Sequence, residues 1–287
     1  MLLQFLGIEV SAKQIQRVSE HYGEALEQHT EQQVQDKVPV PLLELKTPRE
    51  VVYGMIDGSM TFTREKGWKE IKLGRLFRAG SRVQVQARRK EVMQSLYVCH
   101  LGGHKKFLRK FEAYAEPYAC KVFIADGAKW IWNWVEDCYP DAVQILDFYH
   151  ALEKLGVYAA LQYKDEKERH PWMEAQKQAL LSGGVQQLIA GLKDCKAVRK
   201  EAAKAKQAVV QYYQRNVNRM QYHTFVQNGH MIGSGAIEAA HRSVLQQRLK
   251  LSGQRWSING AQQIANLRSC KTSNQWTCLI QLIKAAA

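Results

Sequence analysis

The chain has 287 residues, with 41 lysines and arginines against 27 aspartates and glutamates, so its formal net charge is +14. This length can bury a sizeable core in one elaborated domain or in two, and the excess of positive charge favours an anionic partner, above all nucleic acid. The six cysteines are widely spaced and form no Cys-x-x-Cys pair, which argues against a disulfide framework or a zinc ribbon.

The first part of the chain, residues 1–45, is predicted to be a short helical region. Ser11 is a good N-cap for a helix from Ala12 onward, after a break at Gly7. A partial helix-turn-helix fits this pattern, and so does a plain helical hairpin. The N-terminus carries no basic stretch or cleavage site, and no apolar run approaches the roughly 18 residues that span a bilayer. We therefore expect a cytoplasmic protein with no membrane partner.

The next segment has the pattern of β-strands. Residues 51–56 are an apolar run that ends in Asp57-Gly58, which is typical of a buried strand followed by a turn. Residues 60–63 and 69–77 continue this pattern and predict an antiparallel meander.

A helix–strand alternation follows. We expect a helix over 104–116 and a strand over 121–125, ended by Asp126-Gly127. A helix over 130–135 should stop before Pro140, and a further strand should cover 142–146, with Asp147 opening the next helix.

The remaining chain reads as helical. Residues 151–228 are rich in Ala, Lys, Gln and Glu and predict a helical insertion, after which the turn at Gly233-Ser234-Gly235 starts the helix with Glu238. The order of elements predicts an α/β protein of RNase H-like fold. Its mixed five-stranded sheet would have flanking helices and would come from residues 46–150 and 229–287.

Three carboxylates are candidate metal ligands. Asp57 and Asp126 each stand at the carboxyl end of a predicted strand, the edge at which open α/β sheets bind ligands. Asp-Gly is also an ordinary turn dipeptide, so each aspartate alone has a plain structural explanation. Together with Glu238, however, the two aspartates could hold two Mg²⁺ ions about 3.5–4 Å apart for an in-line phosphoryl displacement.

Four segments resemble bacterial insertion-sequence transposases of the ISKra group. They are residues 126–132 (DGAKWIW), 145–151 (ILDFYHA), 232–242 (IGSGAIEAAHR) and 247–257 (QRLKLSGQRWS). These proteins are DDE transposases with an RNase H-like core, distantly similar to Mutator-like elements. The resemblance covers roughly residues 50 to 270.

The resemblance implies a catalytic triad of Asp57, Asp126 and Glu238, holding two Mg²⁺ ions with Mn²⁺ as a substitute. It also implies an auxiliary role for Asp147 and His150, for which a capping aspartate with a satisfied histidine is the structural alternative. DNA would be the partner, as element ends and as target, and the protein would act as a homo-oligomer associated with the bacterial nucleoid. Relatives have a longer N-terminal region, so this chain is expected to be shortened there.

Basic and aromatic residues follow Glu238 closely. Arg242, Arg248, Lys250 and Arg255 are expected to contact the DNA backbone, and Trp256 to stack on a base. A basic helix face turned to solvent is the alternative explanation for the cations.

The predicted function is thus metal-dependent cleavage and strand transfer of DNA by a transposase. Two other functions remain open at this point. One is a decayed or domesticated transposase that binds DNA without moving it. The other is a host nuclease with an RNase H-like fold.

Overall fold

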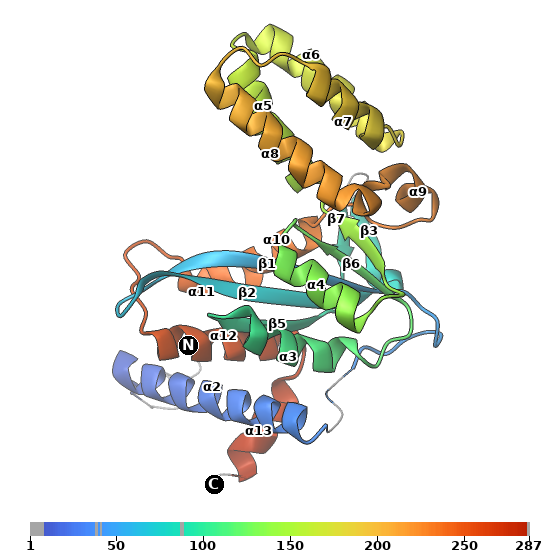
Figure 1. Cartoon of the computed structure of the whole chain (residues 1–287). Helices are drawn as coiled ribbons and strands as arrows, with labels where there is room; N and C mark the ends of the chain where they lie inside the picture. Colours follow the sequence, from blue (N-terminus) through green and yellow to red (C-terminus); the bar gives the residue numbers. More distant parts are fainter. Residues whose placement is uncertain (1–8, 38–39, 41, 87–88, 286–287) are drawn as a thin grey trace. The chain divides into compact units, whose positions relative to one another are not determined.

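The computed structural model describes residues 9–37, 40, 42–86 and 89–285. It is a mixed α/β protein with a five-stranded sheet in the order β5-β2-β1-β6-β7, a separate β3-β4 hairpin and flanking helices (Figure 1). This confirms the predicted mixed five-stranded sheet with flanking helices. The chain divides into two compact units: unit 1 comprises Met1–Lys121 and Ala236–Ala287, and unit 2 comprises Val122–Gly235.

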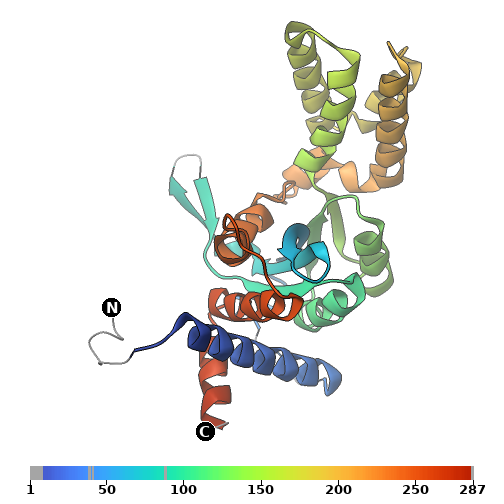
Figure 2. The same ribbon diagram turned by 90° about the vertical axis from the view of Figure 1, so that its left-hand side faces the viewer.

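The strands of unit 1 are long and antiparallel. β1 (Val52–Thr63) pairs along its whole length with β2 (Gly67–Arg78), and β2 pairs with β5 (Leu96–Leu101). The first five residues of β1 are all buried, so this half of the strand is covered on both faces. The short 3₁₀ turn η1 (Ala79–Ser81) leads into the hairpin of β3 (Arg82–Gln86) and β4 (Arg89–Val92), which extends away from these strands (Figure 2).

The predicted turn at Asp57-Gly58 is wrong. Asp57 lies inside β1, opposite Leu73 of β2, and the chain turns only after Thr63, where Gly67 has a φ of 63°. The two expected strands over 51–56 and 60–63 are therefore one strand. Continuous pairing with β2 outweighs the turn preference of Asp-Gly, and the third strand of this group is β5.

Helices cover the strands of unit 1. The helix predicted over 104–116 is present as α3 (His104–Ala115), and it packs against β2 and β5 through Phe107 and Phe111. α12 (Ile258–Thr272) lies along β5, where side-chain oxygens of Gln262 and Ser273 accept hydrogen bonds from strand N–H groups. This side-chain cover protects an otherwise open strand edge.

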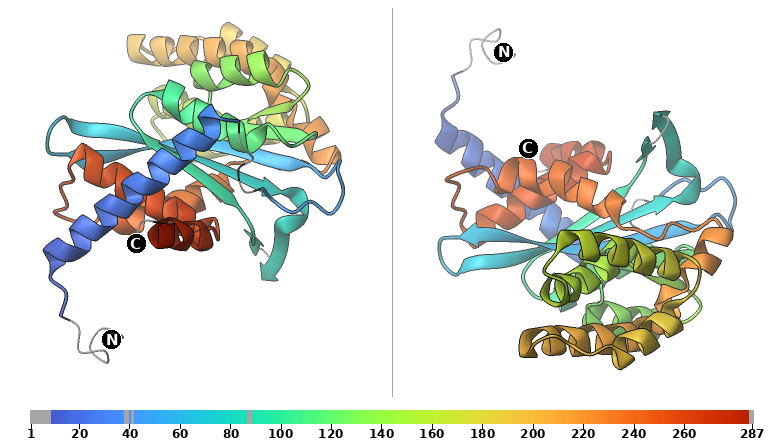
Figure 3. Two further views of the ribbon diagram at one scale, coloured as in Figure 1. Left: turned by 90° about the horizontal axis from the view of Figure 1, so that it is seen from below. Right: turned by 90° about the horizontal axis from the view of Figure 1, so that it is seen from above.

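The N-terminal helix α2 (Ala12–Gln35) packs on α12, and α13 (Trp276–Ala285) packs on α2 (Figure 3). Ser11 is its N-cap within a capping box with Gln14, which confirms the predicted helix start. The first helix of the expected helix-turn-helix falls in residues 1–8, outside the described residues.

Unit 2 combines two parallel strands with a group of helices (Figures 1 and 2). β6 (Lys121–Ala125) pairs with β7 (Val143–Leu146), and α4 (Lys129–Cys138) connects them. All three elements agree with the sequence predictions. The predicted helical insertion is also present, as α5 (Phe148–Gln162), α6 (Glu166–Leu181), α7 (Val185–Asp194), α8 (Lys200–Asn216), η2 (Val217–Met220) and α9 (Tyr222–Gln227).

The segment after unit 2 belongs to unit 1 and changes its helical type. α10 (Gly235–Ala240) passes into a π-helix, η3 (His241–Gln246), and then into α11 (Gln247–Leu249). Within the described part of the chain, no helix combines the length and the apolar character needed to cross a membrane.

Candidate functional site

One face of β1 carries Asp57, and the α10–α11 segment packs on that face. Thr61 lies four positions after Asp57 and therefore on the same face of the strand. Its hydroxyl donates to the backbone oxygen of Leu249 at 3.3 Å. Within the segment, the side chains of Ile237, Val244 and Leu245 are buried. The segment is therefore held against the half of the strand that contains Asp57.

His241 is the residue of this segment that touches Asp57. Its Nε2 lies 3.3 Å from Oδ2 of Asp57, and the imidazole is only 3% exposed. Burial lowers the pKa of His241 to about 4, an effect increased by Lys250 and opposed by Glu238 and the backbone of Asp57. At neutral pH the contact thus joins a neutral imidazole to a carboxylate and is not an ion pair.

Glu238 lies one helical turn before His241 and is exposed. Its charge reaches the imidazole, since it acts on the pKa of His241. Unit 1 therefore brings two of the three predicted acids, Asp57 and Glu238, to the surroundings of one histidine. This histidine also begins the π-helix, a rare feature that is often found at functional sites.

Arg75 fastens the start of the same segment to the sheet. It is buried in β2, and its guanidinium donates to the backbone oxygen of Ala236 at 2.5 Å and to the Ser95 hydroxyl at 2.9 Å. Burial lowers the pKa of Arg75, and the ring of Tyr97 lies 5.3 Å from the guanidinium carbon. Arg75 therefore fixes the backbone two residues before Glu238.

The predicted DNA-binding residues belong to the helical segment that starts at α10 and to the loop that follows it. Arg242, Arg248, Lys250 and Arg255 are exposed, whereas Trp256 is half-buried. The backbone of Trp256 forms an isolated parallel bridge with Thr63, its N–H donating to Phe62 and its oxygen accepting from Arg64. The loop between α11 and α12, residues 250–257 and here called the basic loop, is thus joined to the end of the β1–β2 hairpin.

Asp126 belongs to unit 2 and directly follows β6, as the sequence predicts. Its Oδ1 accepts a hydrogen bond from Ala128 N at 2.9 Å, so the aspartate also forms the local turn. The next residue, Gly127, lies under Tyr212, and a Cβ there would come within 2.1 Å of the tyrosine ring. Gly127 is therefore needed for the close approach of α8, and the half-buried carboxylate lies beside a phenol.

Asp147 and His150 form the capping arrangement that the sequence left as an alternative. Asp147 is fully buried, and its Oδ1 accepts from the backbone N of His150 at 2.6 Å and from its Nδ1 at 3.1 Å. The other oxygen, Oδ2, accepts from Ser234 N. Burial raises the pKa of Asp147, but the hydrogen bonds from His150 and Ser234 more than compensate, and its pKa lies below the usual value.

This pair also ties the Gly233-Ser234-Gly235 turn to the end of β7. Besides the Ser234 contact, Phe148 N donates to the oxygen of Ile232 at 2.9 Å. The buried carboxylate of Asp147 therefore holds the turn that starts the Glu238 helix at Ser234, four residues before Glu238.

The stability of unit 2 is expected to fall as the pH rises from about 6.5 to 9. The hydrogen bond with Asp147 raises the pKa of His150 from 6.5 to about 9, so folding favours the protonated imidazole. Its contribution is complete below pH 6.5 and disappears as the pH passes 9. Hydrogen exchange in residues 147–162, measured at increasing denaturant concentration, should show this decline in the free energy of unfolding. His150→Asn should abolish the decrease in the free energy of unfolding between pH 6.5 and 9, whereas substitution of an exposed histidine, His170→Asn, should leave it unchanged. The same decrease in His150→Asn as in wild type would contradict the assignment.

The described residues contain no group of three or more His, Cys, Asp or Glu side chains placed to hold a metal ion. Asp57 and Glu238 come together in unit 1, and Asp126, Asp147 and His150 in unit 2. Sequence reasoning missed His241, Arg75 and Tyr212 as neighbours of these acids. Only His241 had a signal, because a spacing of three residues puts it on the same helix face as Glu238.

No family model matches this chain, and no match was found among the curated proteins or the solved structures.

Proposed function

We propose that this protein is a transposase that cleaves DNA and transfers strands at the ends of an insertion sequence, using divalent metal ions. The observation that carries the proposal is in unit 1. There η3 places His241 against Asp57, and the charges of Glu238 and Lys250 both act on this histidine. Arg242 and Arg248 are exposed in the same helical segment. Acids near exposed surface cations suit an enzyme that binds a polyanion and hydrolyses it with metal ions.

The proposal assigns Asp57, Asp126 and Glu238 to two Mg²⁺ ions, or to Mn²⁺ as a substitute. The donor chemistry fits: carboxylate oxygens are the ligands that these hard cations prefer, and Asp126 uses only Oδ1 in its turn. When bound, two such ions activate the attacking oxygen and stabilise the leaving oxygen of a phosphodiester. The proposed RNase H-like fold is supported by the chain order of the elements of the five-stranded sheet and their helices, which is β1, β2, β5, α3, β6, α4 and β7, with the separate β3–β4 hairpin between β2 and β5.

The protein's own residues would position these groups. The neutral imidazole of His241 contacts Oδ2 of Asp57 and limits the orientations of that carboxylate. Arg75 fixes the backbone before Glu238, and Asp147 fixes the turn before it. Asp147 therefore acts through positioning rather than as a ligand, and His150 supports it.

The exposed arginines and lysine would bind DNA through its phosphates. Such contacts supply affinity and strong salt dependence but no sequence information. We further propose a homo-oligomer in the assembled state, because two element ends must be joined by the same reaction.

The test uses the full chain with labelled duplexes that carry the DNA flanking its coding sequence. Wild-type protein should nick these ends and join them to a second duplex in Mg²⁺ or Mn²⁺, and EDTA should stop both reactions. DNA binding with no cleavage in either metal would instead identify a DNA-binding protein. Cleavage at many sites without strand joining would identify a nuclease of the same fold.

A further inference from the structure

Unit 1 contains a cleft between its N-terminal helix and the basic loop. The cleft has a volume of about 360 Å³. Residues of α2 form one wall, and the opposite side is formed by the β1–β2 turn, α11 and the loop before α12. The residues used below are Ile15, Gln16, Arg64, Arg248, Arg255 and Trp256. This volume is near the lower end of the range of about 300–1,000 Å³ that holds small ligands, which suits a single nucleotide unit and not a duplex.

The cleft carries an excess of positive charge. Three arginines, Arg64, Arg248 and Arg255, line it, and none of them forms an ion pair within the described residues. The carboxylate that also lines the cleft, Glu20, accepts from Gln16 at 2.8 Å and lies near Gly260 at the start of α12. That helix end favours a negative charge and partly neutralises it. Arg64 donates through Nε to the backbone oxygen of Arg255 at 3.2 Å, and the Arg255 guanidinium lies 5.9 Å from the ring of Phe62. Neither contact neutralises the positive charge that a phosphate group would meet in the cleft.

Trp256 provides an aromatic surface in the same cleft. It is half-buried, and its indole Nε1 is buried with no hydrogen-bond partner in the part of the chain that the structure describes. A flat aromatic ring flanked by arginines is the combination that binds unstacked bases and their phosphates.

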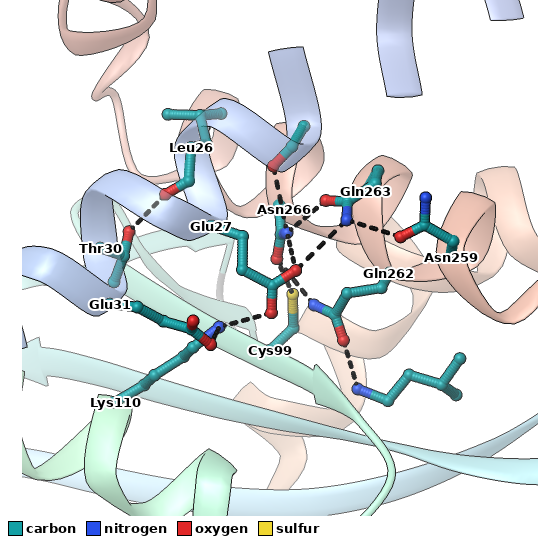
Figure 4. A network of polar contacts seen from close by, with 12 residues as sticks. Leu26, Glu27, Thr30, Glu31, Cys99, Lys110, Asn259, Gln262, Gln263 and Asn266 are labelled. Carbon is teal, nitrogen blue, oxygen red and sulfur yellow. Dashed lines mark hydrogen bonds and ion pairs between the residues drawn. The ribbon is translucent and has the colours of Figure 1, made fainter. Parts of the chain in front are cut away.

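The wall formed by α2 is held rigidly in place. Glu27 of α2 forms a 2.8 Å ion pair with the buried Lys110 of α3, and Asn266 and Gln263 of α12 donate to the same carboxylate (Figure 4). Gly23 allows the close approach of the two helices, because a Cβ there would lie 2.5 Å from the backbone oxygen of Gln263. The cleft is therefore already formed before a ligand arrives.

From this geometry we infer that the cleft binds one unstacked nucleotide of single-stranded DNA, with the base against Trp256 and the adjoining phosphates on the three arginines. The inference rests on the proposed function, because a strand released from the duplex at a cleaved end would supply this nucleotide. It adds α2 and Arg64 to the DNA-binding surface.

The first test compares two charge-introducing variants of the same helix. Ile15 lines the cleft and is 49% exposed, whereas Val18 is 55% exposed and does not line it. Both variants add one negative charge at an exposed site. Their effects on folding and on the long-range electrostatic attraction of the DNA strand should therefore be alike. Binding of a fluorescein-labelled 12-nucleotide thymidine strand is measured by anisotropy in EDTA. We expect Ile15→Glu to weaken binding about tenfold and Val18→Glu less than about twofold.

The second test measures stacking directly. Trp256→Leu should weaken binding of the thymidine strand about tenfold. A strand of abasic sites has no bases to stack, so the variant should bind that strand as tightly as wild type does. The exposed Trp276→Leu, on α13, serves as the control and should change neither affinity. If Trp256→Leu fails to fold, the pair Ile15→Glu and Val18→Glu still decides the question.

Equal affinities of Ile15→Glu and Val18→Glu for the thymidine strand would overturn the inference, as would tighter binding of an RNA strand than of single-stranded DNA. Because these measurements contain no metal, they are independent of the proposed reaction. If wild-type protein binds the strand in the cleft but does not cleave DNA, the inference about the cleft stands and the proposed transposase function fails. If it cleaves DNA but does not bind the strand, the proposed function stands and the inference about the cleft fails.

Discussion

Asp126→Asn is expected to reduce metal-dependent DNA cleavage by about a thousandfold while leaving DNA binding intact. A metal ion supplies several kcal/mol of charge stabilisation in the transition state, and about 4 kcal/mol corresponds to a thousandfold in rate. Asparagine keeps an oxygen that can accept from Ala128 N, so the turn after β6 should be preserved. The loss would therefore reflect the missing negative charge and not a local rearrangement.

Glu238→Gln is expected to have an effect of the same order, because the exposed carboxylate is removed from a helix whose backbone contacts are unchanged. The controls are Asp141→Asn in unit 2 and Glu44→Gln in unit 1, both exposed acids outside the proposed site. Initial nicking rates in Mg²⁺ and affinity for the same duplex in EDTA are measured for all four variants. Wild-type rates in Asp126→Asn or Glu238→Gln, or equal losses in the controls, would remove these residues from catalysis.

The strands and helices around Asp126 could be predicted because their signals are local. A short apolar run before Asp126-Gly127 and another before Asp147 are bounded by turn residues, and β6, α4 and β7 follow those bounds closely. Asp147 also has the N-cap position that its residue type favours. In this part of the chain, local preference and tertiary structure agree.

The same reasoning failed at Asp57-Gly58, because strand pairing there depends on residues far along the chain. Every residue of β1 has a partner in β2, and this long hairpin makes a turn at Gly58 impossible. The third strand, β5, was missed because its polar residues His100 and Tyr97 weaken the apolar pattern. The ring of Tyr97 lies beside Arg75 of β2, and the charge of Lys110 on α3 acts on His100, and no local pattern can reveal these contacts.

The surroundings of the acids were only partly predictable. The spacing from Glu238 indicates that His241 shares its helix face, but neither its burial nor the π-helix has a sequence signal. Arg75 and Tyr212 come from elements distant in sequence, and their contacts arise from packing alone. The candidate acids are therefore easier to find from the sequence than the residues that surround them.

Asp147→Ala is expected to destabilise unit 2 by about 3–5 kcal/mol, the range for breaking a buried pair by removing one partner. Alanine removes the acceptor of three hydrogen bonds, those donated by His150 N, His150 Nδ1 and Ser234 N. The positively charged imidazole loses its counter-charge, and α5 loses its cap. Asp147→Asn, which retains an acceptor for the cap, should cost less.

The matched control for this variant is Asp165→Ala, which removes the N-cap of α6. Asp165 is exposed and accepts from Lys167 N at 2.9 Å, so its loss should cost only about 0.5–2 kcal/mol. Hydrogen exchange in peptides covering 147–152 and 231–235 reports the local free energy of opening. Exchange in both peptides should accelerate together in Asp147→Ala, since the same carboxylate holds the helix start and the Ser234 turn. Acceleration confined to 147–152 would show that the turn before Glu238 is held by other contacts, and a loss equal to that of Asp165→Ala would show that burial of the pair adds nothing to a simple cap.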